Sequence, residues 1–155
     1  MDVHVRRYCE GEAAHLWKLH FHTVRVVNRS DYTQAQVEAW APVDFDPQVW
    51  ATRIHALNPF VATIDSQIVG YADVQQFGYI DHFYVHHQFQ RRGVGRALFA
   101  QLDAVAKIAG LRQMHANVSI TARPFFESYG FVAIVEQQIP LRGQVLTNIK
   151  MVRDL

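Results

Sequence analysis

Residues 85–98 decide the fold and read Val85-His86-His87-Gln88-Phe89-Gln90-Arg91-Arg92-Gly93-Val94-Gly95-Arg96-Ala97-Leu98. This stretch joins an apolar strand to a helix with apolar periodicity through the pattern Gln-x-x-Gly-x-Gly. Such a turn leaves consecutive backbone N–H groups without helical partners, at the positive end of the helix dipole. Gly93 and Gly95 have no Cβ, so an anion can come close to the backbone. With the charges of Arg91, Arg92 and Arg96 around it, the turn is predicted to bind phosphate.

Two common nucleotide-binding motifs are excluded at this turn. There is no Gly-Lys-Ser/Thr, so it is not a P-loop, and Leu98 stands where a Rossmann fingerprint has its third glycine. An ordinary strand–turn–helix stays open as the alternative explanation of the Gly-x-Gly alone. A nucleic-acid patch is disfavoured, because the three arginines have no aromatic residues between them and the chain is nearly neutral.

The composition indicates one globular domain spanning residues 1–155. Of the 155 residues 50% are hydrophobic and 19% are charged, with a net charge of +1, which gives no general sign of a nucleic-acid or membrane partner. Cys9 is the only cysteine, so an intrachain disulfide is excluded. The N-terminus lacks the apolar core of a signal peptide, and no apolar run reaches the ~20 residues of a membrane span. We expect a cytoplasmic protein.

Hydrophobic periodicity and turn signals predict a mixed-sheet α/β domain, with helices flanking a central sheet. A strand–helix–strand unit around the glycine turn implies a parallel pair, and the hairpins imply antiparallel neighbours. The strands are expected at Val3–Tyr8, Phe60–Ile64, Ile68–Val74, Tyr79–Val85, Arg112–Val118, Phe131–Gln137 and Val145–Val152. The helices are expected at Glu12–Val27, Gln34–Trp40, the segment after the Asp46 cap, Gly93–Ala109 and Ala122–Tyr129.

Two motifs together resemble the GCN5-related N-acetyltransferase (GNAT) superfamily. One is the strand Tyr79–Val85 leading into Gln90-Arg91-Arg92-Gly93-Val94-Gly95. The other, residues 119–131, reads Ser119-Ile120-Thr121-Ala122-Arg123-Pro124-Phe125-Phe126-Glu127-Ser128-Tyr129-Gly130-Phe131 and looks like the superfamily's short helix ending in Gly-Phe. The order of elements matches along nearly the whole chain. The adjacent phenylalanines and the later Arg142-Gly143 are similar to the YafP-like branch.

The resemblance implies an acetyl-CoA-dependent N-acetyltransferase that transfers directly, in a ternary complex, to an amine of a small molecule or peptide. Acetyl-CoA would lie where the parallel strands Tyr79–Val85 and Gln113–Val118 splay apart, with its pantetheine on the open strand edge and its carbonyl near a backbone N–H of Phe83. The implied cofactor-binding residues are Phe83, Tyr84, Val85, Gln90, Arg91, Arg92, Gly93, Val94, Gly95, Arg96, Ser119 and Phe126.

The chain departs from the family pattern at the proton donor. A tyrosine four residues before the glycine of Gly-Phe is the usual general acid, and here that residue is Phe126, which has no proton to give. Tyr129 is on a different helix face and does not simply replace it. A non-catalytic acyl-CoA-binding or protein-interaction module therefore stays open. Asp81 is the predicted base, because alternation on one strand would put it beside Phe83 and Val85, whereas His82 is expected to be a packed histidine.

The acceptor pocket is expected from the first helices and their loops, where aromatic residues concentrate. His22 and Tyr32 are the predicted substrate-binding residues, because they lie near an irregular segment. An aromatic pocket without an acidic cluster suits a small amphipathic or aromatic amine better than a polycation. The nine histidines lack the spacing of a zinc site, so no metal is expected. A monomer and a homodimer both stay open.

Overall fold

The computed structural model describes residues 2–155 and forms the mixed α/β architecture that the sequence predicts. Its elements in chain order are β1 (His4–Arg7), α1 (Ala13–Val26), η1 (Asn28–Ser30), α2 (Gln34–Trp40), α3 (Pro47–Leu57), β2 (Phe60–Ile64), β3 (Gln67–Ala72), η2 (Gln76–Gly78), β4 (Tyr79–Ile80), β5 (Phe83–Val85), α4 (Val94–Ile108), β6 (Gln113–Ser119), α5 (Arg123–Ser128), β7 (Val132–Leu141) and β8 (Gln144–Asp154).

The predicted helix starts are confirmed where the sequence carries a cap. Asp46 accepts hydrogen bonds from the N–H groups of Gln48 and Val49 at the start of α3. Thr33 and Gln36 form a reciprocal capping box at the start of α2. In the C-terminal hairpin, β7 continues to Leu141, beyond the predicted end at Gln137, and β8 is longer than predicted at both ends. The pairing extends to the hairpin tip because Arg142 and Gly143 make a tight turn with positive φ.

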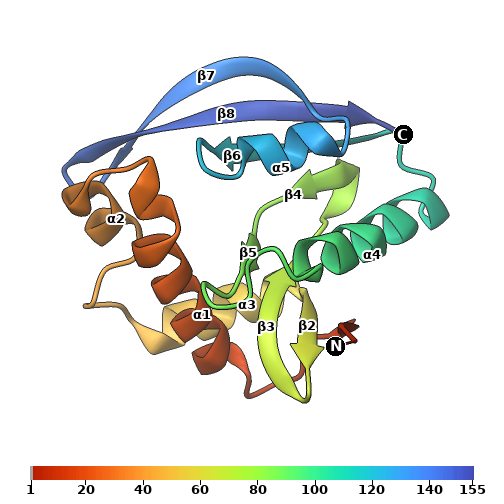
Figure 1. The fold of residues 1–155 in the computed structure, drawn as a ribbon, viewed down its shortest axis with the longest axis horizontal. Helices are drawn as coiled ribbons and strands as arrows, with labels where there is room; N and C mark the ends of the chain where they lie inside the picture. Colours follow the sequence, from red (N-terminus) through yellow and green to blue (C-terminus); the bar gives the residue numbers. More distant parts are fainter. Residues whose placement is uncertain (1) are drawn as a thin grey trace.

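The strands form two four-stranded sheets in the orders β1-β2-β3-β5 and β4-β6-β8-β7. The first is antiparallel throughout, and in the second β4 runs parallel to β6, as the strand–helix–strand order requires. Figure 1 shows β7 and β8 along the top and β2 and β3 below, with β4 and β5 between them. The chain thus passes from one sheet to the other between β4 and β5.

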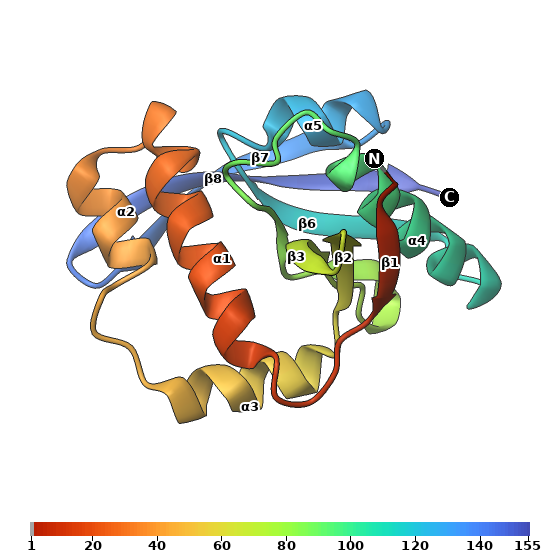
Figure 2. The same cartoon turned by 60° about the horizontal axis from the view of Figure 1, so that its bottom comes forward.

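The central strand β2 sends alternate side chains to opposite cores, with Phe60, Ala62 and Ile64 in one cluster and Val61 in the other. On one face α4 packs, with Val94 and Leu98 in the same cluster as Ala62 and close to Gly70 of β3. On the other face α1 and α3 pack, with Leu16 and Trp50 in the same cluster as β2 and β3 (Figure 2). This explains why every residue of β2 is buried and why it reads as a continuous apolar run. Of the helices in residues 2–155, none is long and apolar enough to cross a bilayer.

The single strand predicted at Tyr79–Val85 is wrong, because Asp81 and His82 interrupt it. Asp73, which is 1% exposed, lies across the break. Its carboxylate accepts hydrogen bonds from the N–H groups of His82 (2.6 Å) and Asp81 (3.3 Å) and from the Gln75 side chain (2.8 Å). Its own N–H donates to the carbonyl of His82 at 3.1 Å. These four bonds hold the chain in the bend that separates the sheets.

Asp73 also makes the stability of the fold depend on pH. Burial raises the pKa of its carboxyl from 3.8 to about 6, although the hydrogen bonds that the carboxylate accepts lower the pKa. The folded protein therefore takes up this proton at a higher pH than the unfolded chain. The carboxyl's contribution to the free energy of unfolding is full below pH 3.8 and falls as the pH rises through about 6.

We predict that Asp73→Ala lowers the free energy of unfolding by about 1–3 kcal/mol at pH 7.5, because buried N–H donors lose their acceptor. The loss should be greater by about 1 kcal/mol at pH 5, where the wild-type carboxyl is protonated only when folded. Urea unfolding of both proteins at the two pH values measures this. Asp65→Asn, in the exposed β2–β3 turn, is the control and should change neither quantity. A loss that is the same at both pH values would contradict the assignment.

Candidate functional site

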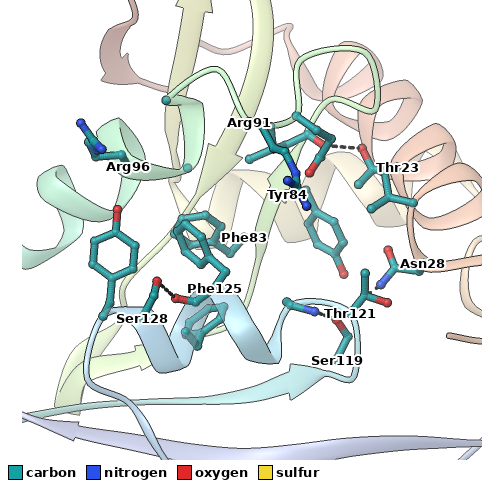
Figure 3. A pocket seen from close by; sticks show the side chains of 18 residues that line it. Thr23, Asn28, Phe83, Tyr84, Arg91, Arg96, Ser119, Thr121, Phe125 and Ser128 are labelled. Atoms are coloured by element: carbon teal, nitrogen blue, oxygen red, sulfur yellow. Dashed lines mark hydrogen bonds between the residues drawn. The ribbon is translucent and has the colours of Figure 1, made fainter. Parts of the chain in front are cut away.

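A first pocket of about 550 Å³ opens along the outer edge of β5. Its walls come from α1 with η1, from the turn before α4, and from α5 with the segment that precedes it. Figure 3 shows Thr23 and Asn28 at one end of the pocket and Arg96 and Ser128 at the other. The pocket therefore joins the anion-binding turn to the place where the two sheets separate.

The edge of β5 that lines this pocket has free backbone groups. In the pairing with β3, Asp73 N–H bonds to the His82 carbonyl and His86 N–H bonds to the Val69 carbonyl. In an antiparallel pair the hydrogen-bonding groups of successive residues alternate in direction. The N–H and C=O groups of Phe83 and Val85 consequently point away from β3, toward the pocket.

Two side chains already occupy one of these groups. The carbonyl of Val85 accepts a hydrogen bond from Thr23 Oγ1 at 2.9 Å and another from Gln90 Nε2 at 2.8 Å. Gln90 thereby closes the loop between β5 and α4, which explains the glutamine of the motif. The N–H groups of Phe83 and Val85 and the carbonyl of Phe83 stay open to a ligand.

The turn before α4 has the conformation of an anion-binding site. Gly93 is the N-cap of α4, with φ +82° and open space where a Cβ would be. Arg91 has φ +60°, which is strained for a residue with a side chain. The first main-chain bond of α4 runs from Ala97 N–H to Gly93 O at 3.0 Å, so the N–H groups before it have no helical acceptor. Gly95 serves packing, because a Cβ there would lie 2.9 Å from the Phe125 ring.

Most of the residues predicted to bind the cofactor line the first pocket: Phe83, Tyr84, Val85, Gln90, Arg91, Gly93, Gly95, Arg96, Ser119 and Phe126. Two do not. The Val94 side chain is 1% exposed and packs under β3, so only its backbone is available. The Arg92 guanidinium lies over the Phe89 ring at 5.2 Å. The residues that the sequence argument missed are Thr23, Val27, Asn28, Thr121, Ala122, Phe125, Ser128 and Tyr129.

Two of the lining residues bear on what the first pocket holds. Thr121 Oγ1 is sealed from solvent and has no hydrogen-bond partner in the described chain. An unsatisfied polar atom in a pocket wall is a ready contact for a polar ligand. Phe126 is 4% exposed and packs edge-to-face against Phe131, with ring centroids 5.0 Å apart. It belongs mainly to the core and shows the pocket only a small apolar surface.

A second pocket, of about 670 Å³, lies on the other side of β5. Rings from the first helices and β5 form one wall, among them Trp17, Trp40, Trp50, Phe45 and His20. The opposite wall mixes polar and apolar residues with Arg142, and its Asn117 and Asn148 side-chain oxygens accept hydrogen bonds from Gln137 Nε2. Tyr84 and Ser119 line both pockets, so the two meet there.

Asp81 lies in the second pocket and not beside Phe83 and Val85. The expected alternation fails because the strand is broken at this residue. Its carboxylate pairs with Arg53 at 3.2 Å. Tyr32 also lines the second pocket, with its hydroxyl donating to the Thr147 carbonyl and accepting from Ile120 N–H.

His22, which the sequence analysis predicts to bind the substrate, lines neither of these two pockets. His22 is exposed and lines a separate surface hollow beside His86, because that part of α1 faces away from both pockets. The histidines that line the second pocket are His20 and His82, of which the sequence analysis expected His82 to be a packing residue.

Burial keeps both pocket histidines uncharged. Burial, together with the nearby Arg53 charge, lowers the pKa of His82 to about 3. Burial, with smaller effects of His82 and Arg53, also lowers the pKa of His20 well below its ordinary value. Within residues 2–155, no group of three or more His, Cys, Asp or Glu side chains is arranged to hold a metal ion.

Known proteins share this architecture. The chain is 31% identical over 150 residues to the uncharacterized N-acetyltransferase YafP of Escherichia coli K12, covering 97% of this chain and 95% of that protein. A GCN5-related N-acetyltransferase structure from Rhodopseudomonas palustris superimposes with a TM-score of 0.95 at 28% identity, covering 100% of this chain and 97% of the other. The PaiA N-acetyltransferase of Thermoplasma acidophilum, solved with coenzyme A, has a TM-score of 0.76 at 13% identity and full coverage of both chains.

A family model also matches the chain. The model of the acetyltransferase (GNAT) domain matches residues 28–153, which include the glycine turn, the broken strand and the short helix α5. This match and the similarity to YafP confirm the resemblance that the two sequence motifs carry. The chain belongs to the GNAT family of N-acetyltransferases.

Proposed function

We propose that the protein transfers an acetyl group from acetyl-CoA directly to an amine of a small molecule or peptide, with both substrates bound at once. The observation that carries this proposal is the pair of pockets that meet at Tyr84 and Ser119. One pocket has an anion-binding turn and an open strand edge, and the other is aromatic. Two substrates that enter from opposite sides would therefore come together at one point.

The first pocket fits the donor. The free N–H and C=O groups on the edge of β5 can pair with the amides of pantetheine, as an added strand would. The free N–H groups around Gly93 can receive the pyrophosphate. That a protein of the same fold was solved with coenzyme A supports this choice.

The groups at the junction can serve the chemistry of transfer. The amine must be neutral, the thioester carbonyl polarised and the leaving sulfur stabilised. Phe83 N–H is a free donor on the β5 edge for the carbonyl oxygen. Asp81 is the base that we propose, acting directly or through water from the second pocket, with Arg53 holding its carboxylate in place.

Tyr84 is the proton-bearing group that we propose for the leaving sulfur, since Phe126 has no hydroxyl. It lines both pockets, whereas Asp81 lines only one. Burial raises the pKa of the Tyr84 hydroxyl well above its ordinary value, so the hydroxyl keeps its proton and acts as a hydrogen-bond donor.

A non-catalytic acyl-CoA-binding module is the second candidate, and Phe126 is the observation that favours it. The two functions differ in turnover. An amine panel with acetyl-CoA, followed by mass detection of acetylated products and by release of free CoA thiol, separates them. Tight acetyl-CoA binding without thiol release above hydrolysis for any amine would support the module.

We predict that Gly93→Asp abolishes measurable acetyl-CoA binding, because it places a negative side chain in the anion-binding turn. Calorimetric titration measures the affinity. Gly110→Asp is the matched control, since Gly110 also has positive φ and open space around it, at the far end of α4. The control should bind acetyl-CoA like the wild type. Unchanged affinity in a folded Gly93→Asp protein would remove the donor site from this pocket.

We predict that Asp81→Asn lowers kcat by about 10²–10⁴-fold, as loss of a general base does. The affinity for acetyl-CoA should not change, because Asp81 lies outside the donor pocket. Steady-state kinetics over pH 5–9 and calorimetry test the two parts. Asp65→Asn, which makes the same change far from both pockets, should keep the wild-type profile. Parallel losses of kcat and affinity would make Asp81 structural.

A further inference from the structure

The hydrogen bond between Tyr71 and His82 fixes which nitrogen of His82 carries its proton. The Tyr71 side chain is fully buried, and its hydroxyl lies 2.9 Å from His82 Nδ1, its one partner among residues 2–155. Burial raises the pKa of this hydroxyl well above the ordinary value, so it stays protonated. A buried O–H with one partner donates to it, since otherwise its proton would be unsatisfied. Nδ1 is thus the acceptor, and the neutral imidazole carries its proton on Nε2.

The protonated nitrogen of His82 faces the second pocket. The ring lines that pocket and is 6% exposed. Nε2 has no hydrogen-bond partner within residues 2–155, yet it is not among the unpartnered side-chain atoms that are sealed from solvent. The backbone of His82 is held by Asp73 at both its N–H and its carbonyl. His82 therefore presents one fixed N–H donor to whatever occupies the pocket.

We propose that His82 Nε2–H donates a hydrogen bond to an oxygen of the acceptor substrate, and that this substrate is a small aromatic amine with a carbonyl group beside the amine. The proposal rests on the proposed function, in which the second pocket holds the acceptor. His82 lines only that pocket, so its partner belongs to the acceptor and not to the thioester. The surrounding rings of Trp17, Trp50 and Tyr84 suit an aromatic body.

An amine without such an oxygen is a poorer substrate for a physical reason. It would cover Nε2–H without accepting its hydrogen bond, and a buried donor without an acceptor is costly. The expected penalty in kcat/KM is about 10–100-fold.

The first experiment determines which nitrogen of His82 is protonated, and it does not depend on turnover. In protein labelled with ¹⁵N-histidine, NMR at pH 7.5 should show His82 Nδ1 unprotonated and Nε2 protonated. In Tyr71→Phe, which removes one buried hydroxyl, that single tautomer should be lost. A wild-type His82 protonated on Nδ1 would overturn the proposal.

The second experiment uses two matched amines, phenylalanine amide and 2-phenylethylamine, which differ by the carboxamide. With CoA bound, phenylalanine amide should shift the His82 Nε2–H resonance and 2-phenylethylamine should not. In turnover, the wild type should favour phenylalanine amide about 10–100-fold in kcat/KM. His82→Phe should reduce this preference to nearly one while the affinity for acetyl-CoA is unchanged. Tyr71→Phe, which lies outside the pocket, should weaken the preference in the same direction.

The outcomes separate this proposal from the proposed function. An equal loss for both amines in the His82→Phe and Tyr71→Phe proteins would show that His82 does not recognise the carbonyl, and would overturn the inference while acetyl transfer stands. Absence of turnover with every amine, together with the expected shift of Nε2–H on adding phenylalanine amide, would overturn the transferase and keep the recognition. No shift of the His82 Nε2–H resonance, together with no preference between the two amines, would overturn the inference about His82.

Discussion

The fold depends on the hydrogen bonds that one buried carboxylate accepts from two consecutive backbone N–H groups. Asp73 holds Asp81 and His82 in a bend, so β4 stays with one sheet and β5 with the other. Without this bend the two short strands would continue one another, and the edge of β5 would not be left open. The same contact fixes the His82 backbone, which lets Tyr71 set the direction of its ring hydrogen bond. The buried carboxylate of Asp73 thus determines the shape of both pockets, because it holds the bend that lies between them.

The two pockets differ in the interactions that they offer to a ligand. The first pocket offers backbone N–H groups and the charges of Arg91 and Arg96, which attract an anion over a distance that salt shortens. The second pocket offers aromatic rings, the neutral imidazoles of His20 and His82 and the Arg53–Asp81 ion pair, which together suit an aromatic ligand with polar groups. Tyr84 separates these environments and belongs to both. In the function that we propose, this junction is where the acetyl carrier meets the amine.

Local sequence signals made much of the fold predictable. The bend and several pocket residues could not be predicted, because contacts between residues far apart in the sequence determine them. The caps of α2 and α3 and the glycine turn of α4 each depend on residues within a few positions. The break at Asp81 has no glycine or proline within it to signal it, because Asp73, directly after β3, imposes it through hydrogen bonds. The same reason explains the misplaced faces of Asp81 and His22 and the missed contribution of Thr23 from α1.

The double occupation of the Val85 carbonyl by Thr23 and Gln90 has a consequence for association between molecules. An exposed strand edge is a template on which other chains can add and aggregate. Here the edge of β5 offers only a donor, an acceptor and a donor in succession before the pattern ends. A foreign β-strand would find no acceptor at Val85 and could not propagate, while a short ligand with two amides could still fit. The Thr23 and Gln90 side chains therefore limit strand addition at the edge of β5.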